Sequence, residues 1–220
     1  MTNGHHNPHG KTLMLLGATG LVGGEALRLA LADARVARVV APTRHALPAH
    51  PKLQNPVVDF QALPTQAAWW TVDAVICALG TTMAKAGSQQ AFRRVDYDMP
   101  LETARLCRER GAAAYALNSA LGADTNSSVF YSRVKGELED ALKALGYPSL
   151  TLVRPGLLGG QRKEDRPRER LFIRIGMLVG PLLPRRWRVS QPDAVARHLL
   201  EGALAGAPGV QVVQAEAFAA

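Results

Sequence analysis

A short apolar segment that runs directly into a glycine-rich turn constrains this chain most. Thr12–Leu16 is a continuous apolar run, which is typical of a strand buried on both faces of a parallel sheet. Gly17, Gly20 and Gly23 follow with the spacing G-x-x-G-x-x-G, and an amphipathic helix is predicted from about residue 21 to residue 32. Strand, glycine turn and helix in this order predict a loop that binds the pyrophosphate of a dinucleotide.

Strand and helix patterns alternate along the rest of the chain. Further strands are predicted at 36–41, 57–58, 73–79, 113–119, 149–154 and, as a late edge strand, 210–213. Helices are predicted at 89–110 with a break or fresh first turn at Pro100, at 127–145 with a stop at Gly146, and from about residue 191. This order predicts a doubly wound parallel sheet with helices on both faces, in a single α/β domain over residues 11–220. Residues 1–10 read as a disordered leader.

The end of the second strand bears on which dinucleotide is bound. Enzymes that use NAD usually place Asp or Glu there to hold the ribose hydroxyls, but this chain has Pro42-Thr43-Arg44-His45. The guanidinium of Arg44 suits a 2′-phosphate, so NADP(H) is favoured over NAD(H). Asp59, after the third strand, is a candidate acceptor for the adenine amino group, with Phe60 beside it. An exposed arginine and a carboxylate that caps a loop are the alternatives.

Three residues form a candidate catalytic group. Tyr131 and Lys135 are four residues apart on a predicted helix and therefore project from one face. Ser119 ends the preceding strand, at the edge where ligands bind in open α/β sheets. In hydride transfer Tyr131 would exchange a proton with the substrate oxygen, Lys135 would stabilise the phenolate, and Ser119 would hydrogen-bond the reacting oxygen. The alternative is an ordinary surface pair of tyrosine and lysine.

With these residues the chain resembles the atypical short-chain dehydrogenases/reductases, in particular the branch around the HIV Tat-interacting oxidoreductase. The resemblance covers nearly the whole chain after the leader. Its motifs are G-A-T-G-L-V-G at 17–23, L-G-T-T-M-A-K-A-G at 79–87, R-V-D-Y at 94–97, N-S-A-L-G-A-D at 118–124, Y-S-R-V-K-G-E at 131–137 and R-P-G-L-L at 154–158, together with Gln161–Arg166 and Glu169.

The resemblance implies a Rossmann fold, NADP(H) binding, and an active site of Ser119, Tyr131 and Lys135. It also implies that Arg154, Pro155, Gly156 and Leu157 line the nicotinamide pocket. The chain departs from relatives at Ala120, where they often carry a second serine, and at Asp96, where sugar-nucleotide relatives often carry Asn. If the second serine is the working one, the assignment of Ser119 fails.

Motif and resemblance together give one set of predicted cofactor-binding residues. The set is Gly17, Thr19, Gly20, Leu21, Val22, Arg44, Asp59, Phe60, Leu79, Gly80, Thr81, Tyr131, Lys135, Arg154, Pro155, Gly156 and Leu157. No metal site is predicted, since Cys77 and Cys107 lack the spacing of metal ligands.

The net charge of +8 and a pI of about 10 point to an anionic partner. Arginines crowd residues 162–188, within a predicted substrate or lid region at 157–190. That region reads as a lid that draws in an anionic substrate, as a surface that contacts a membrane peripherally, or as a solvated loop followed by a core helix. Aromatic residues make up only 5% of the chain, so nucleic acid is not expected.

No stretch of about twenty apolar residues predicts a spanning helix. Two unpaired cysteines and the lack of a signal-like start lead us to expect a cytoplasmic protein. We also expect a monomer or a small homo-oligomer. The favoured function is an NADP(H)-dependent oxidoreductase that acts on a small carbonyl or alcohol. The alternative is an NADP(H)-binding sensor or regulator without strong catalysis. A sugar-nucleotide epimerase is disfavoured, because the chain is short for a full substrate domain.

Overall fold

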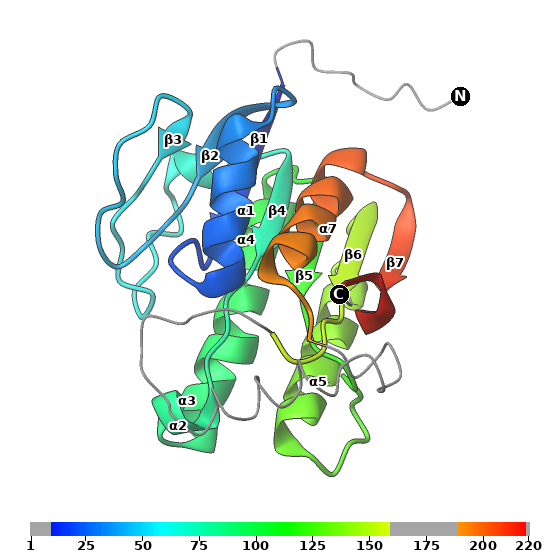
Figure 1. The fold of residues 1–220 in the computed structure, drawn as a ribbon. Helices are drawn as coiled ribbons and strands as arrows, with labels where there is room; N and C mark the ends of the chain where they lie inside the picture. Colours follow the sequence, from blue (N-terminus) through cyan, green and yellow to red (C-terminus); the bar gives the residue numbers. More distant parts are fainter. Residues whose placement is uncertain (1–9, 159–188, 219–220) are drawn as a thin grey trace.

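A computed structural model of the chain describes residues 10–158 and 189–218. Its seven strands form one parallel sheet with the order β3-β2-β1-β4-β5-β6-β7. The strands are β1 (Lys11–Leu16), β2 (Val36–Val40), β3 (Leu53–Gln54), β4 (Ala74–Cys77), β5 (Ala114–Asn118), β6 (Ser149–Val153) and β7 (Gly209–Val213). This is the Rossmann fold predicted from the alternating pattern (Figure 1).

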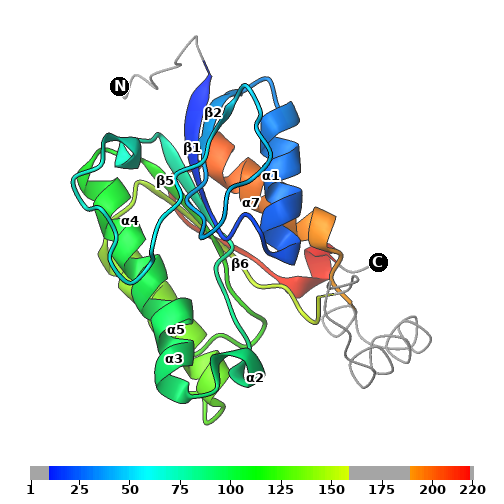
Figure 2. The same ribbon diagram turned by 90° about the vertical axis from the view of Figure 1, so that its left-hand side faces the viewer.

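Helices cover both faces of this sheet, as Figure 2 shows with the sheet seen nearly edge-on. α1 (Leu21–Ala32) and α7 (Pro192–Ala205) pack side by side on one face, while α4 (Met99–Glu109) and α5 (Phe130–Ala144) lie on the other. The short α2 (Met83–Ala86) and α3 (Gln89–Arg93) precede α4, and single 3₁₀ turns lie at Ala68–Trp70 and Ala215–Phe218. The described helices include none that is long and apolar enough to span a membrane.

The central strands explain the continuous apolar runs in the sequence. Every residue of β4 and β6 is buried, as are the first four of β5, because side chains on both faces of these strands lie under helices. The two resulting cores lie on either side of the sheet, one under α1 and α7 and the other under α4 and α5. Helix ends follow local chemistry: Gly146 and Gly206 adopt positive φ just beyond α5 and α7.

Two predicted elements differ from the structure. The expected strand at Val57–Val58 is a single bridge between Thr43 and Val57, and β3 forms earlier, at Leu53–Gln54. Pro56 has no N–H group to donate, so the ladder beside β2 is interrupted there. The helix expected at 89–110 contains a π-helical turn at Arg94–Asp98 between α3 and α4, whereas Pro100 is accommodated in the first turn of α4.

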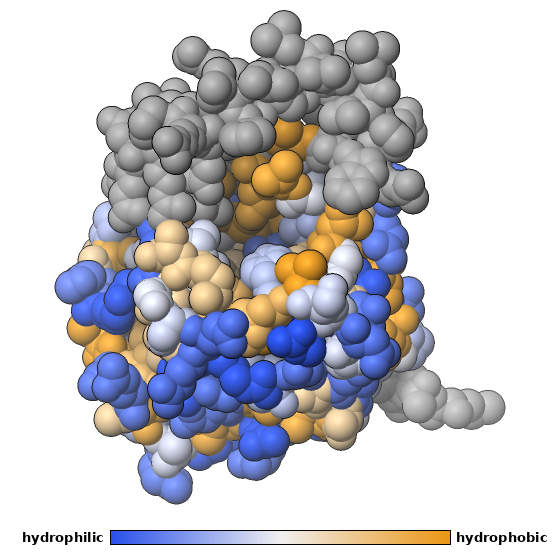
Figure 3. All heavy atoms as spheres, turned by 90° about the horizontal axis from the view of Figure 1, so that it is seen from below, coloured by the Kyte–Doolittle hydropathy of each residue, from blue (hydrophilic) through white to orange (hydrophobic). Residues whose placement is uncertain are grey.

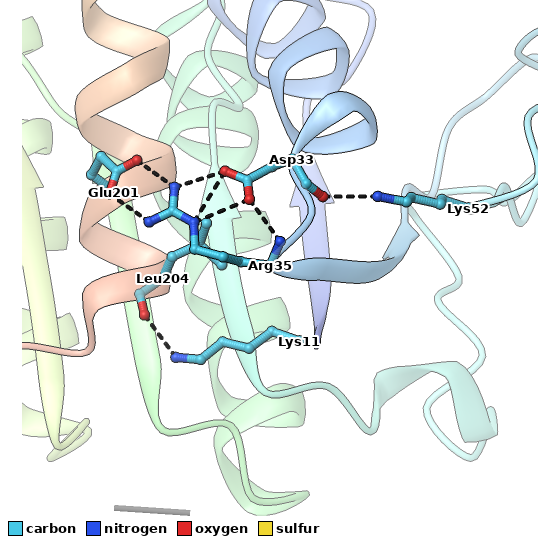
Figure 4. Close-up of polar contacts among 6 residues, drawn as sticks. All are labelled: Lys11, Asp33, Arg35, Lys52, Glu201 and Leu204. Atoms are coloured by element: carbon cyan, nitrogen blue, oxygen red, sulfur yellow. Dashed lines mark hydrogen bonds and ion pairs between the residues drawn. The ribbon is translucent and has the colours of Figure 1, made fainter. Parts of the chain in front are cut away.

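Polar contacts fasten the two helices of one face at the end of the sheet where the strands begin. Figure 4 shows the residues involved, Lys11, Asp33, Arg35, Lys52, Glu201 and Leu204. The guanidinium of Arg35 contacts Asp33 at 2.7 Å and Glu201 of α7 at 2.6 Å, and Lys11 of β1 donates to the carbonyl of Leu204 at 2.9 Å. This network ties α1 and α7 to the first strands at the edge opposite the strands' carboxyl ends.

Candidate functional site

A pocket of about 930 Å³ opens at the carboxyl ends of β1, β4, β5 and β6. Figure 3 looks onto this side of the molecule and shows apolar surface around a central hollow. The strand order reverses between β1 and β4, which is the point where open α/β sheets bind ligands. The lining comprises residues 19–22, 24–25, 78–83, 85, 96, 118–121, 131, 135 and 155–158.

The glycine loop forms one wall of the pocket. Gly17 has a φ of 83°, and a Cβ placed there would lie 2.6 Å from the carbonyl oxygen of Ala78. A Cβ on Gly23 would lie 2.0 Å from the carbonyl oxygen of Gly17, so only glycine lets the first turn of α1 pack against the loop. Thr19 and Gly20 line the pocket beyond this contact. The loop therefore has the close backbone packing that the spacing predicted.

The first turn of α1 faces this pocket and contains no acidic side chain, while Glu25 in the next turn also lines the pocket. Gly20 is the N-cap residue and provides no side-chain cap, and the first turn contains no Asp or Glu. Gly20, Leu21 and Val22 line the pocket beside these uncapped N–H groups. Such a helix N-terminus attracts anions.

Lys135 is held by a buried ion pair. Its Nζ lies 2.8 Å from Oδ1 of Asp96, and both side chains are at most 4% exposed. The other carboxylate oxygen of Asp96 accepts a hydrogen bond from the N–H of Thr81 at 2.8 Å. Burial by itself lowers the pKa of Lys135, but the charges of Asp96 and Tyr131 outweigh burial, and the pKa is raised. Lys135 is therefore a fixed positive charge in the pocket wall.

Asp96 belongs to the π-helical turn between α3 and α4. In the sequence Asp96 stands out only as a departure from sugar-nucleotide relatives, with no predicted role in the site. Its partners Lys135 and Thr81 are 39 and 15 positions away in the sequence, so spacing carries no signal of their contact. Asn118 was likewise overlooked: it lines the pocket, and its Oδ1 is buried without a hydrogen-bond partner among the described residues.

Tyr131 lies on the same face of α5 as Lys135, one turn earlier. It lies in the first turn of α5 with 39% of its surface exposed, and its ring packs edge-on against Phe92 at 5.8 Å. Tyr131 and Lys135 both line the pocket, as the four-residue spacing predicted. The phenol is therefore open to a ligand while its ring is braced by α3.

Ser119 lines the pocket, but its hydroxyl contacts a carboxylate. Its Oγ donates to Oε1 of Glu139 at 2.5 Å, and Glu139 also accepts from Nε of Arg154 at 3.0 Å. Glu139 is only 1% exposed, so this cluster is internal. Ala120, which follows Ser119, lines the pocket without a hydroxyl.

The predicted residues after β6 separate into two groups. Pro155, Gly156 and Leu157 line the pocket, whereas Arg154 is outside the lining and pairs with Glu139. Leu79, Gly80 and Thr81, which follow β4, line the pocket.

Besides Arg154, four predicted cofactor residues lie outside the lining. Gly17 lies behind it, in the turn that packs against Ala78. The other three are Arg44, Asp59 and Phe60. Arg44 is exposed in the loop after β2. Oδ1 of Asp59 accepts from the backbone N–H of Gln61 at 2.8 Å, and the carbonyl of Phe60 accepts from Arg94 at 3.2 Å. The leader at 1–9 and residues 159–188 of the predicted lid lie outside the described residues.

Comparisons with known proteins give close sequence relatives and distant structural ones. No family model matches the chain. The mitochondrial protein fmp52 of Aspergillus clavatus is 36% identical over 206 residues, which are 89% of this chain and 88% of that protein. The mitochondrial protein FMP52 of Candida albicans is 33% identical over 161 residues, 69% of each chain. The expectation of a cytoplasmic protein is wrong on this comparison, because these relatives are named as mitochondrial proteins.

Solved structures share the fold at low sequence identity. MoeE5 in complex with UDP-glucose and NAD aligns with a TM-score of 0.70 at 18% identity, over 92% of this chain and 75% of that chain. A short-chain dehydrogenase family protein from Francisella tularensis aligns with a TM-score of 0.64 at 13% identity, over 94% of this chain and 98% of that chain. These likenesses confirm the Rossmann architecture.

Proposed function

The chain belongs to the family of the mitochondrial Fmp52 proteins, and we propose that it is a nicotinamide-dependent oxidoreductase acting on a small carbonyl or alcohol. One observation carries the proposal: Tyr131 and Lys135 line the same pocket as the glycine loop. A proton donor, a fixed cation and a phosphate-binding loop in one pocket are what hydride transfer between a dinucleotide and a carbonyl needs. The NAD-bound MoeE5 structure, which shares the fold, supports the same class of cofactor.

The pocket fits a nicotinamide dinucleotide in three respects. The uncapped N-terminus of α1 has no acidic residue in its first turn and suits a pyrophosphate. Gly80 lines the pocket close to Asp96 and Lys135 and has no side chain to occupy the space there. The unpartnered Oδ1 of Asn118 can accept a hydrogen bond from an amide such as a carboxamide.

The residues of this chain divide the proton chemistry between them. Tyr131 gives a proton to the substrate oxygen during reduction, and takes one during oxidation. Lys135, held in place by Asp96 at 2.8 Å, stabilises the negative charge that develops on the phenol oxygen. The bound dinucleotide supplies or accepts the hydride.

We test the catalytic assignment by replacing Tyr131 with Phe. In a screen of small aldehydes and ketones that follows NADPH consumption, Y131F should lower kcat by about 10²- to 10⁴-fold, the usual contribution of a general acid. Tyr147→Phe is the matched control: that hydroxyl bonds the carbonyl of Ala104 at 2.7 Å, outside the pocket lining, so the variant should keep its activity. Full activity in Y131F would refute the mechanism.

The preference for NADP(H) over NAD(H) is a separate proposal. It rests on Arg44, which is exposed after β2, and on the lack of a carboxylate in Pro42–His45. Calorimetric titration should find NADPH binding at least about tenfold tighter than NADH, and R44A should remove most of the difference. Equal affinities in the unmodified protein, or an unchanged preference in R44A, would contradict this role.

One observation favours a sensor that binds the cofactor with little catalysis. The hydroxyl of Ser119 donates its hydrogen bond to Glu139, and Ala120 has no hydroxyl. Neither residue therefore donates a hydrogen bond to the reacting oxygen. Tight NADPH binding together with no turnover of any carbonyl in the screen would support the sensor over the enzyme.

A further inference from the structure

Apolar side chains form part of the lining of the pocket that contains Tyr131 and Lys135. Leu121, Pro155, Leu157 and Leu158 line it from the strand ends, and Met83 lines it from α2. Leu157 is 71% exposed and Met83 is 40% exposed, unusually open for large apolar side chains. These five residues make up the apolar wall of the pocket.

The backbone around Leu157 is tied down, so its exposure is not that of a loose loop. The carbonyl of Leu157 accepts from the N–H of Ser190 at 2.8 Å, and the hydroxyl of Ser190 accepts from the N–H of Gly156 at 3.0 Å. On the neighbouring strand end, the N–H of Leu121 donates to the carbonyl of Pro155 at 2.9 Å. Leu121, Pro155 and Leu157 are therefore held by backbone hydrogen bonds in the lining of the pocket that contains Tyr131.

The charged groups around the wall are already engaged. Lys135 pairs with Asp96, and Arg154 pairs with Glu139. Lys85, the other lysine in the lining, has an interaction of its own. A carboxylate or phosphate on the substrate would have to give up its water and compete with these existing partners for a cation, which is unfavourable.

We propose that the substrate is an uncharged apolar carbonyl compound or the matching alcohol, with an aliphatic or aromatic body that lies on the apolar wall. This inference rests on the proposed function and specifies its substrate class. In reduction the C=O π bond opens, the carbon receives a hydride from the dihydronicotinamide, and the oxygen receives the proton of Tyr131. The cofactor is thereby oxidised, and Tyr131 regains a proton from water.

The test compares neutral and charged substrates of matched length. Hexanal is paired with 6-oxohexanoate, and 4-methylbenzaldehyde is paired with 4-carboxybenzaldehyde. The neutral member of each pair should have a kcat/KM at least about tenfold higher, because only the charged member has to take a carboxylate out of water to lie on the wall. A preference for the charged members, or equal rates, would overturn the inference while leaving the oxidoreductase in place.

A binding measurement keeps the test independent of turnover. Hexanamide and adipic acid monoamide, which do not react, are titrated into the NADP⁺-loaded protein and followed by ligand-observed NMR. Hexanamide should bind at least about tenfold more tightly, because it has no carboxylate to desolvate. If no aldehyde is turned over, the proposed function fails, and these affinities still decide the inference: weaker, equal or undetectable binding of hexanamide overturns it.

Two variants locate the effect. Leu157→Lys should weaken hexanamide by about tenfold and strengthen the charged partner, because it replaces exposed apolar wall by a cation. Val57→Lys is the control, since Val57 is 59% exposed but lies outside the pocket lining. V57K should leave both affinities unchanged, and an equal response of the two variants would contradict the placement of the substrate on the wall.

Discussion

Gly23 and Gly24 are neighbours in the first turns of α1, and the structure gives them opposite responses to alanine. A Cβ on Gly23 would lie 2.0 Å from the carbonyl oxygen of Gly17, well inside the 3.0 Å that real Cβ contacts respect. A Cβ on Gly24 would meet only the carbonyl oxygen of Ala18, at an ordinary 3.7 Å. One methyl group therefore tests the close approach of α1 to the glycine loop.

The size of each effect follows from two terms. Alanine in place of glycine inside a helix stabilises by about 1 kcal/mol, and this term is common to both variants. In G23A the oxygen of Gly17 must also retreat by about 1 Å, and overpacking of this kind costs about 1–3 kcal/mol. Backbone atoms have no alternative rotamer, so the upper end applies. The net expectation is a loss of about 2 kcal/mol for G23A and a gain of about 1 kcal/mol for G24A.

Thermal unfolding followed by circular dichroism measures both effects. At about 2–4 °C per kcal/mol for a chain of this size, Tm should fall by about 4–8 °C in G23A and rise by about 2–4 °C in G24A. Added NADPH should raise Tm less in G23A than in the unmodified protein, because the displaced loop is the proposed phosphate site. If G23A is as stable as G24A, the packing of α1 on Gly17 is not what requires glycine at position 23.

Three further predictions follow from buried and paired groups. Asp96→Asn should destabilise the protein by about 3 kcal/mol in urea unfolding, because it leaves Lys135 buried without its ion pair. It should also lower the pKa of Lys135, which Asp96 raises, so the loss of activity at high pH should begin at a lower pH. Burial raises the pKa of the Cys107 thiol to about 12, so at pH 8 this thiol should react with an aromatic disulfide only after the protein unfolds. Fast labelling of the native protein would contradict the burial of this thiol. Arg35 lowers the pKa of Glu201, so this carboxylate stabilises the fold above its unfolded pKa of 4.5, and the contribution is lost as the pH falls through the folded pKa. Both side chains are more than half exposed, so E201Q should cost at most about 1 kcal/mol at pH 7 and nothing in strong acid; a cost that persists in acid would argue against the ion pair.

The sequence determined the architecture because its signals are local. Continuous apolar runs indicate strands covered on both faces, and Gly17, Gly20 and Gly23 indicate a tight turn that opens a helix. The four-residue spacing of Tyr131 and Lys135 also needs only the helical period to place both on one face. The apolar pair at Val57 predicts a strand, but Pro56 beside it lacks the N–H group that a strand needs. The strand therefore forms earlier, at Leu53–Gln54, and Val57 makes only a single bridge.

Only the tertiary structure decided the partners of the catalytic candidates. Asp96 reaches Lys135 because a π-helical turn between α3 and α4 packs against α5, and Glu139 reaches Ser119 because α5 lies over the end of β5. Contacts between residues so distant in the chain depend on how elements pack, and no periodicity or spacing encodes them. The sequence by itself determined that this protein presents a glycine loop, a tyrosine and a lysine at one edge of a parallel sheet. The fold decided which carboxylates hold that lysine and that serine, because a buried charge or hydroxyl takes the partner that packing brings within reach.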